Sequence, residues 1–262
     1  METIPVWDAY GQEGECPLCI LRDRAEGRYI DFFLGNSVMA PEMRVQVNRT
    51  GFCPRHFSLL LEGDNRLGLA LMTHTHLLEL TGKIKRRHRQ LKQGADRILS
   101  THGVLSVPKK ADSLRRDVES AARFVDEVRE SCLICERLTS TLERYAFTIL
   151  YLWERDEDFK RALQTSRGFC LPHLGFVNTL ATEVLSSGRL SEWLLAIMPV
   201  AEESLERLGE ELHGFIQSFD YQRGDKDPQA GLDERSMGDA LPRALQKITG
   251  VTMNGWKKNG RK

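Results

Sequence analysis

The pattern that decides the fold is Cys16-Pro17-Leu18-Cys19, followed further along the chain by Gly51-Phe52-Cys53-Pro54-Arg55-His56. A second copy supplies Cys132-Leu133-Ile134-Cys135 and Gly168-Phe169-Cys170-Leu171-Pro172-His173. All 6 cysteines of the chain fall within these motifs. Each copy holds three thiols and one imidazole, which together make the ligand set of a closed tetrahedral Cys3His zinc site.

We therefore expect two metal sites per chain, one formed by each copy. The first would use Cys16, Cys19, Cys53 and His56, and the second would use Cys132, Cys135, Cys170 and His173. Zn²⁺ is the favoured ion, because Cys3His is a common zinc ligand set and four protein ligands leave no open position for catalysis. An iron–sulfur cluster is an alternative, although such clusters are usually held by cysteines alone. Thiol–disulfide switching by the CxxC pairs is another.

The spacing explains why such residues would meet around one ion. A CxxC or CxxH at the start of a helix directs two ligands to one point, where the positive end of the helix dipole lowers thiol pKa values. Glycine before the third ligand allows a positive φ angle or a close approach. The adjacent phenylalanines would exclude water, and nearby arginines could offset the negative charge of three thiolates. These residues are Gly51, Phe52 and Gly168, Phe169, with Arg49, Arg55 and Arg167.

Further matches between the copies indicate an internal duplication. Arg28-Tyr29 corresponds to Arg144-Tyr145 and Arg44 corresponds to Arg161, at an offset of 116 to 117 residues. We interpret this as a repeated unit of roughly 90 to 115 residues.

Apolar residues recur at helical spacing through most of the chain, which predicts an all-α protein. Only Val45-Gln46-Val47 suggests a strand. We expect two tandem, related helical subdomains at residues 1–100 and 112–220, joined by a connection at 101–111, where Gly103 and Pro108 fall. Residues 221–262 are predicted to form a polar, flexible tail, with one docked amphipathic helix near Leu241–Ile248.

Composition narrows the functional class. Lys+Arg and Asp+Glu are both 37, so no global charge draws the chain to nucleic acid or to an anionic membrane. The N-terminal residues carry no secretory signal and no segment is apolar enough to cross a membrane. We expect a soluble cytoplasmic protein, in which thiols stay reduced and available to metal.

Two charged segments remain. Lys83–Lys92 holds six Lys or Arg residues and no acid, which would allow phosphate contacts on a helix, but a solvated helix end is the favoured interpretation. The segment around Glu202–Glu211 is interpreted as a solvated acidic face, and Leu190–Ala201 as core packing or a dimer interface. The sequence has no GxSxG motif and no P-loop.

The CPxC and GFCxxH motifs at Cys16–Cys19 and Gly51–His56, their second copies and Arg44 resemble those of a bacterial family of unknown function. The resemblance covers roughly residues 10 to 215, and it implies a helical protein of similar length without implying a reaction. The two closed sites and the lack of a catalytic constellation favour a non-enzymatic interaction or regulatory protein with an unknown protein partner. A redox or iron–sulfur protein, or a nucleic-acid-binding protein using residues 83–92, are the alternatives.

Overall fold

In the computed structural model the described residues are 1–100, 107–217 and 238–252, and every regular element among them is helical. The all-α prediction is confirmed. The elements in chain order are α1 (Thr3–Tyr10), α2 (Pro17–Leu34), the short 3-10 helix η1 (Asn36–Met39), α3 (Pro41–Thr50), α4 (Pro54–Glu62), α5 (Arg66–Leu99), α6 (Val107–Glu130), α7 (Leu133–Arg155), α8 (Glu157–Gln164), α9 (Leu171–Val184), α10 (Ser187–Gln217) and α12 (Ala240–Thr249).

One detail of the sequence interpretation is wrong. Val45-Gln46-Val47 lies inside α3 and not in a strand, because one side of this helix packs on α5 and only Val47 of the three residues is buried. Helix α5 continues through Gly94 to Leu99, since Gly94 faces Leu114 of α6 and the two helices pack together there.

The chain divides into two compact units that do not follow the two sequence copies. Unit 1 contains Met1–Ala25 and Thr139–Lys262, and unit 2 contains Glu26–Leu138. The division falls within α2 and within α7. Tandem subdomains at residues 1–100 and 112–220 stay a prediction, and residues 101–106 of the expected connection lie outside the described residues.

Unit 1 is held by an aromatic and aliphatic core. Trp153 and Trp193 meet edge to face with ring centroids 5.3 Å apart, and Trp7 meets Phe159 in the same way at 5.2 Å. Trp193 is fully buried, and its indole N–H donates to Asn178. Burying aromatic side chains of this size removes a large apolar area from water, so this core is a major source of stability for the unit. The same cluster contains Cys16, Cys19 and Cys170.

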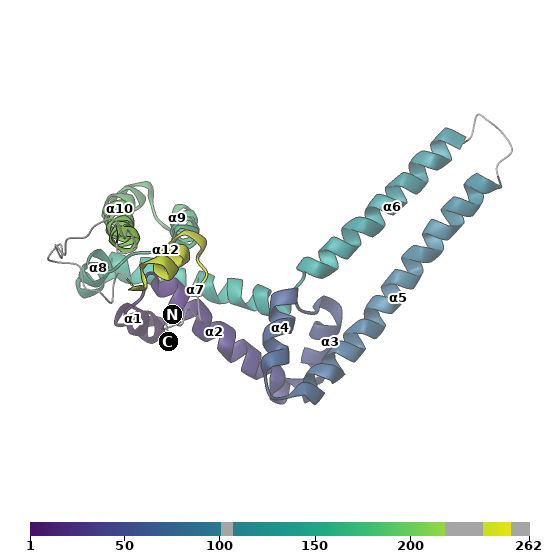
Figure 1. Ribbon diagram of the computed structural model, residues 1–262, viewed down its shortest axis with the longest axis horizontal. Coiled ribbons are helices and arrows are strands. Elements are labelled where there is room, and N and C mark those ends of the chain that lie inside the picture. The colour runs from purple at the N-terminus through teal and green to yellow at the C-terminus, as the bar shows by residue number, and fades with distance from the viewer. Residues whose placement is uncertain (101–106, 218–237, 253–262) are drawn as a thin grey trace. The chain divides into compact units, whose positions relative to one another are not determined.

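Unit 2 contains a smaller core and a helical hairpin. Phe33, Phe52 and Phe57 form a chain of edge-to-face contacts at 5.1 and 5.5 Å. The long helices α5 and α6 run side by side (Figure 1) and are the helix pair with the most extensive contact in the unit.

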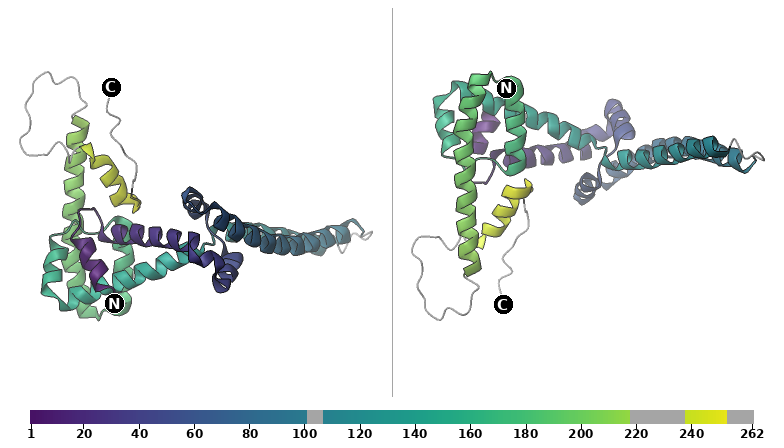
Figure 2. Two further views of the ribbon diagram at one scale, coloured as in Figure 1. Left: turned by 90° about the horizontal axis from the view of Figure 1, so that it is seen from below. Right: turned by 90° about the horizontal axis from the view of Figure 1, so that it is seen from above.

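The amphipathic segment near the C-terminus forms α12, which packs on α10 and α9 in unit 1 (Figures 1 and 2). The segment near Leu241–Ile248, where a docked helix was expected, lies within α12, whereas residues 221–237 and 253–262 of the expected tail lie outside the described part of the chain. No helix among the described residues has the length and apolarity required to cross a membrane.

Candidate metal centres

The structure gathers all eight expected ligands into two clusters, but it pairs the motifs across the sequence copies. Cluster A contains Cys16, Cys19, Cys170 and His173, all in unit 1. Cluster B contains Cys53, His56, Cys132 and Cys135, all in unit 2. The prediction that each copy builds its own site is therefore wrong. The reason is the length of α2 and α7: each helix carries its CxxC at one end and the CxxH of the same copy follows only beyond the other end.

Each cluster lies between the N-terminal ends of two helices. In cluster A the CxxC opens α2, and Cys170 occupies the N-cap position of α9. In cluster B the CxxC opens α7, and Cys53 occupies the N-cap position of α4. Because helix N-termini favour negative charge, both arrangements stabilise thiolates.

The turns before the CxxH motifs require glycine. Gly51 and Gly168 have φ angles of 73° and 64°, in the left-handed region that other residues seldom adopt. A Cβ atom on residue 51 would lie 2.5 Å from His76 Nε2. The phenylalanines that follow, Phe52 and Phe169, are buried as expected.

Ligand-atom separations in cluster A match a single tetrahedral ion. The Nδ1 of His173 lies 3.4 Å from the Sγ of Cys16, 3.5 Å from that of Cys19 and 3.2 Å from that of Cys170. The Sγ atoms of Cys19 and Cys170 are 3.7 Å apart. Zinc bond lengths of ~2.3 Å to sulfur and ~2.0 Å to nitrogen give tetrahedral edges of ~3.8 Å between sulfurs and ~3.5 Å between sulfur and nitrogen.

Cluster B has the same dimensions. His56 Nδ1 lies 3.3 Å from Cys53 Sγ, 3.1 Å from Cys132 Sγ and 3.4 Å from Cys135 Sγ. The Sγ atoms of Cys53 and Cys135 are 3.9 Å apart, and the backbone N–H of Cys135 donates to Cys132 Sγ. Cysteine 135 is exposed and Cys53 is half-buried, whereas all four ligands of cluster A are buried.

A carboxylate fixes the histidine of cluster B. The Oε1 of Glu26 lies 3.0 Å from His56 Nε2, and the Arg55 guanidinium donates to Oε2 of the same carboxylate at 2.8 Å. Because the Nε2–H of His56 donates to the Glu26 carboxylate, Nδ1 is the nitrogen available to a metal ion. A carboxylate in this position is a common way to orient a histidine ligand. Glu26 was not predicted from the sequence. The equivalent residue of the second copy is Leu142, so a comparison of the two copies does not mark this position as a matched functional residue.

The backbone next to cluster A is held by a residue from α12. The buried ammonium group of Lys247 donates to the carbonyl oxygen of Glu15 at 3.1 Å and to that of Arg167. In cluster B the Ser131 hydroxyl, which occupies the position equivalent to Glu15, donates to the Thr50 carbonyl at 2.7 Å. In cluster B the two ligand-bearing segments are therefore joined by a direct hydrogen bond, whereas in cluster A Lys247 bridges them by binding a carbonyl oxygen of each. Burial lowers the pKa of Lys247, and the charge of Glu15 partly offsets that effect.

An ion-pair network surrounds the Glu15 carboxylate, which is 0% exposed. Arg167 donates to it at 3.0 Å, Arg207 of α10 at 2.7 Å and Arg243 of α12 at 3.2 Å. Arg207 and Arg243 also bind Glu211. Burial raises the pKa of Glu211, but the two guanidinium groups lower it by more, so the pKa lies below its usual value. The network joins the segments before both ligand motifs of cluster A to α10 and α12.

Two of the three arginines expected beside the ligands contact carboxylates that lie next to the clusters. Arg55 binds Glu26 and Arg167 binds Glu15, whereas the backbone carbonyl of Arg49 accepts a hydrogen bond from Lys83 Nζ at 3.5 Å. Arg44, shared by the two motif copies, donates to the carbonyls of Val38 and Leu71, so its role is to hold α3 against its neighbours.

The pKa values of the cluster thiols reflect how closely their sulfur atoms lie to one another and how far they are buried. A hydrogen bond with Cys16 and burial raise the pKa of Cys19 to about 12. Cys16 lowers the pKa of Cys170, but the bond with Cys19 and burial raise it to about 11. In cluster B burial and the charge of Cys132 raise the pKa of Cys135. Because neighbouring thiolates repel one another, a divalent cation is what allows all three thiols of a cluster to ionise together.

The basic segment 83–92 lies on α5. It is distant in sequence from the ligands of both clusters, and most of its side chains are exposed. Lys83 is half-buried near Glu79, and the Arg87 guanidinium lies 3.6 Å from the ring centroid of Phe124 on α6. Its remaining cations, Lys85, Arg86, Arg89 and Lys92, are exposed.

The chain belongs to a family of unknown function (DUF6062), whose sequence model matches residues 1–255. No curated protein matches the chain. No solved structure matches it either.

Proposed function

We propose that the protein binds two zinc ions, one in each Cys3His cluster, as structural centres of a non-enzymatic interaction or regulatory protein. The observation that carries the proposal is the eight ligand-atom separations described above, 3.1 to 3.9 Å, which fit the edges of a tetrahedron around one Zn²⁺. Eight ligands from four helix ends would then hold two ions with no open coordination position.

The pairing across sequence copies gives each ion a mechanical role. In unit 1 the ion would join the start of α2 to the start of α9, and in unit 2 it would join the start of α4 to the start of α7. These segments are far apart in sequence, so each ion would close a long loop and reduce the conformational entropy of the unfolded chain. Metal binding of this kind contributes directly to folding free energy.

The alternatives are less well supported by the geometry. An iron–sulfur cluster is a body of several atoms, whereas the ligand atoms of each site lie within 4.8 Å of one another, a space suited to a single ion. All six cysteines are free thiols in the structure, so neither CxxC pair is joined by a disulfide bond. Nucleic-acid binding through residues 83–92 would rest on the four exposed cations alone. A reducing compartment such as the cytoplasm is proposed because thiolate ligands require it.

Elemental analysis and a visible spectrum of protein purified without added metal test the proposal. We expect about two zinc ions per chain and no colour. Replacing zinc with Co²⁺ should give the visible absorption of a tetrahedral thiolate site, which reports on geometry independently of stoichiometry. Iron with a broad visible band would overturn the proposal in favour of redox chemistry, and metal-free protein with thiols that oxidise readily in pairs would favour a dithiol switch.

A further inference from the structure

Helices α5 and α6 form an antiparallel hairpin within unit 2. Among the described residues α6 packs extensively on α5 alone, and Figure 1 shows the two helices side by side. Helix α3 contacts α5 through Thr75 and His76, whereas Leu77, on another side of α5, is 58% exposed. Apolar residues on a face of a two-helix hairpin stay in water unless a further layer covers them.

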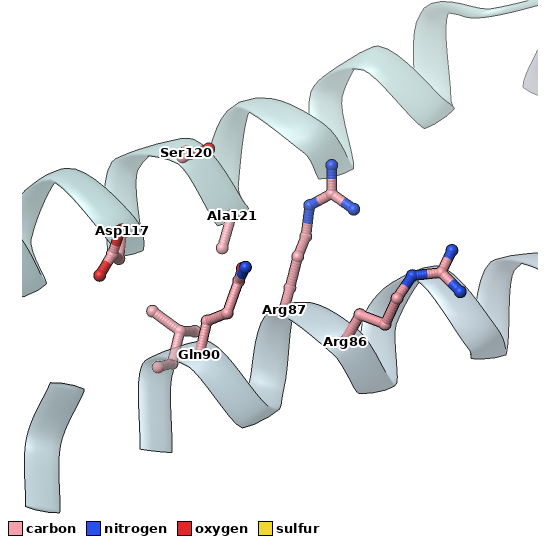
Figure 3. Close-up of a pocket in the computed structure, with 7 residues that line it drawn as sticks. Arg86, Arg87, Gln90, Asp117, Ser120 and Ala121 are labelled. Atoms are coloured by element: carbon pink, nitrogen blue, oxygen red, sulfur yellow. The ribbon is translucent and has the colours of Figure 1, made fainter. Parts of the chain in front are cut away.

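One face of the hairpin is polar. It carries the hollow drawn in Figure 3, which lies between α5 and α6. Charged and polar side chains of both helices line this hollow, among them Arg86, Gln90, Asp117 and Ser120. Such side chains are stable in water, so this face needs no covering layer.

The opposite face is apolar. Successive residues of a helix are about 100° apart, so residues on either side of the line of contact between α5 and α6 point to opposite faces of the hairpin. Arg87 and Phe124 mark that line. Across it from the hollow lie one histidine and seven apolar residues: Ile84, His88, Ala95 and Leu99 of α5, and Ala111, Val118, Ala122 and Val125 of α6. Leu99 is 81% exposed, Val125 61% and Val118 52%, which is typical of a surface that binds another protein.

Charged residues flank the apolar face along its outer edges. On α5 these are Lys85, Lys92 and Asp96, and on α6 they are Arg115, Glu119 and Asp126, all exposed. The contact of Arg115 with Asp112 at 4.0 Å is an exposed pair that solvent weakens. The signs run positive, positive, negative along α5 and, read backwards, negative, negative, positive along α6.

The register of the hairpin sets these opposite signs at equal heights. The Arg87 guanidinium lies 3.6 Å from the centroid of the Phe124 ring. Counting away from this contact by equal numbers of residues on the two antiparallel helices places three pairs level: Lys85 with Asp126, Lys92 with Glu119 and Asp96 with Arg115. Within one hairpin the members of a pair lie on opposite outer edges, with both helices between them. A second hairpin laid on the apolar face by a twofold axis parallel to the helices keeps the same heights, so each charge then meets its opposite.

We propose that the apolar face of the α5–α6 hairpin binds the same face of a second copy of this chain, which forms an antiparallel four-helix bundle. Helix α5 of each copy then lies against α6 of the other, and the apolar residues form the centre of the bundle. The charge pairs flank that centre and fix the register, and the symmetry makes each pair twice. The contact uses residues of unit 2 alone and does not depend on which ion the clusters hold.

A second copy matches features that a nucleic acid or an acidic protein helix does not. A polyanion would pair with Lys85 and Lys92 but would be repelled by Glu119 and Asp126, and it would leave Val125 in water. An acidic helix would be repelled in the same way by the carboxylates on the edges. The same face of this chain provides both the apolar surface and the opposite charge at each height.

Light scattering after gel filtration, over a range of protein concentrations and at low and high salt, tests the proposal on the full metal-loaded chain. We expect the mass of a dimer at high protein concentration, with dissociation favoured by dilution and by salt because the flanking ion pairs are screened. A monomeric mass at every concentration would overturn the proposal. A monomer that binds RNA or DNA at low salt through Lys85 and Lys92 would also overturn it, in favour of a polyanion site.

Charge exchange tests the register. In Lys85→Glu/Lys92→Glu and in Glu119→Lys/Asp126→Lys, four attractive pairs of the dimer become repulsive, so each variant alone should dimerise at least about tenfold more weakly. An equal mixture of the two should recover the affinity, because every reversed edge again meets its opposite. The chain with all four substitutions should recover it as well. Failure of both recoveries, with the variants folded, would contradict the assignment.

Two matched controls use other sides of the same helices. Arg86→Glu/Arg116→Glu reverses two exposed cations outside the proposed contact, with the same change of net charge as Lys85→Glu/Lys92→Glu, and should dimerise like the wild type. Val125→Glu places a carboxylate in the centre of the bundle and should weaken the dimer at least about tenfold, whereas Ser120→Glu, beside the hollow, should not. Metal content and melting temperature of every variant distinguish loss of the interface from loss of the fold. A dimer that Val125→Glu leaves intact would show that another surface holds the two copies together.

Discussion

The Sγ atoms of Cys19 and Cys170 lie 3.7 Å apart although the residues are separated by 151 positions in the sequence. Cys19 belongs to the CxxC of the first copy and Cys170 to the CxxH motif of the second. The same exchange brings Cys53 to 3.9 Å from Cys135. The two copies of the motif are therefore mutually dependent, because neither copy can complete a four-ligand site without a residue pair from the other.

The carboxylate behind His56 should matter for metal affinity at cluster B. Replacing Glu26→Gln removes the charge that orients His56 and should weaken metal binding at this cluster by about 10- to 100-fold. Competition with a chromogenic chelator measures the effect, and only one of the two ions should become easier to remove. Asp31→Asn, an exposed carboxylate on the same helix, is the control. Equal chelator resistance of the two variants would show that Glu26 does not support the site.

The glycines before the third ligands should be intolerant to alanine. Gly51→Ala combines a positive φ with a collision against the His76 ring and should destabilise by more than about 2 kcal/mol. In Gly168→Ala the new Cβ would lie 3.1 Å from Val200 Cγ1, a milder contact, so the free energy of unfolding should fall by less, about 1 to 2 kcal/mol. Gly27→Ala, in an exposed helical position with no heavy atom within 4 Å, should stabilise by about 0.5 to 1 kcal/mol. Urea unfolding measures all three, and a neutral Gly51→Ala would contradict the account.

Lys247 should stabilise the docked position of α12. The Lys247→Met variant keeps the length of the side chain but leaves the carbonyls of Glu15 and Arg167 without this donor, at an expected cost of about 1 to 3 kcal/mol. Hydrogen exchange of the amides in Ala240–Thr249 should accelerate, and the melting temperature should fall. Lys160→Met, which removes a surface pair with Glu157, should change neither. Unchanged exchange in α12 would show that the lysine has no such role.

Metal binding at cluster A should release protons and strengthen as pH rises. The pKa values of Cys19 and Cys170, about 12 and about 11, keep both thiols protonated at neutral pH until a cation displaces their protons. Affinity should therefore increase by about two decades per pH unit between pH 6 and 8, with two or more protons released per ion. Zinc titration of the Cys53→Ser/Cys132→Ser variant, which retains cluster A alone, in buffers of different ionisation enthalpy measures this release. A pH-independent affinity would contradict it.

The ligand residues were predictable from sequence because the motif is complete and repeated, and the helices followed from apolar periodicity. The pairing of Cys16 with Cys170 was not, because spacing within each copy is equally compatible with a site closed in that copy. Only the direction of α2 and α7 decides between the two. Glu26 and Lys247 were missed for a different reason: neither has a counterpart in the other copy, and each contacts residues distant in sequence. The strand expected at Val45–Val47 failed because packing of α3 on α5 outweighs weak local β preference.

Metal stoichiometry of two matched double variants tests the exchanged pairing most directly. Cys16→Ser/Cys170→Ser removes two ligands of cluster A and leaves cluster B whole, whereas Cys16→Ser/Cys53→Ser removes one ligand from each cluster. Elemental analysis of the purified proteins should find about one zinc per chain in the first variant and none bound tightly in the second. The opposite result, with no tightly bound zinc in the first and one ion in the second, would show that each copy of the motif closes its own site.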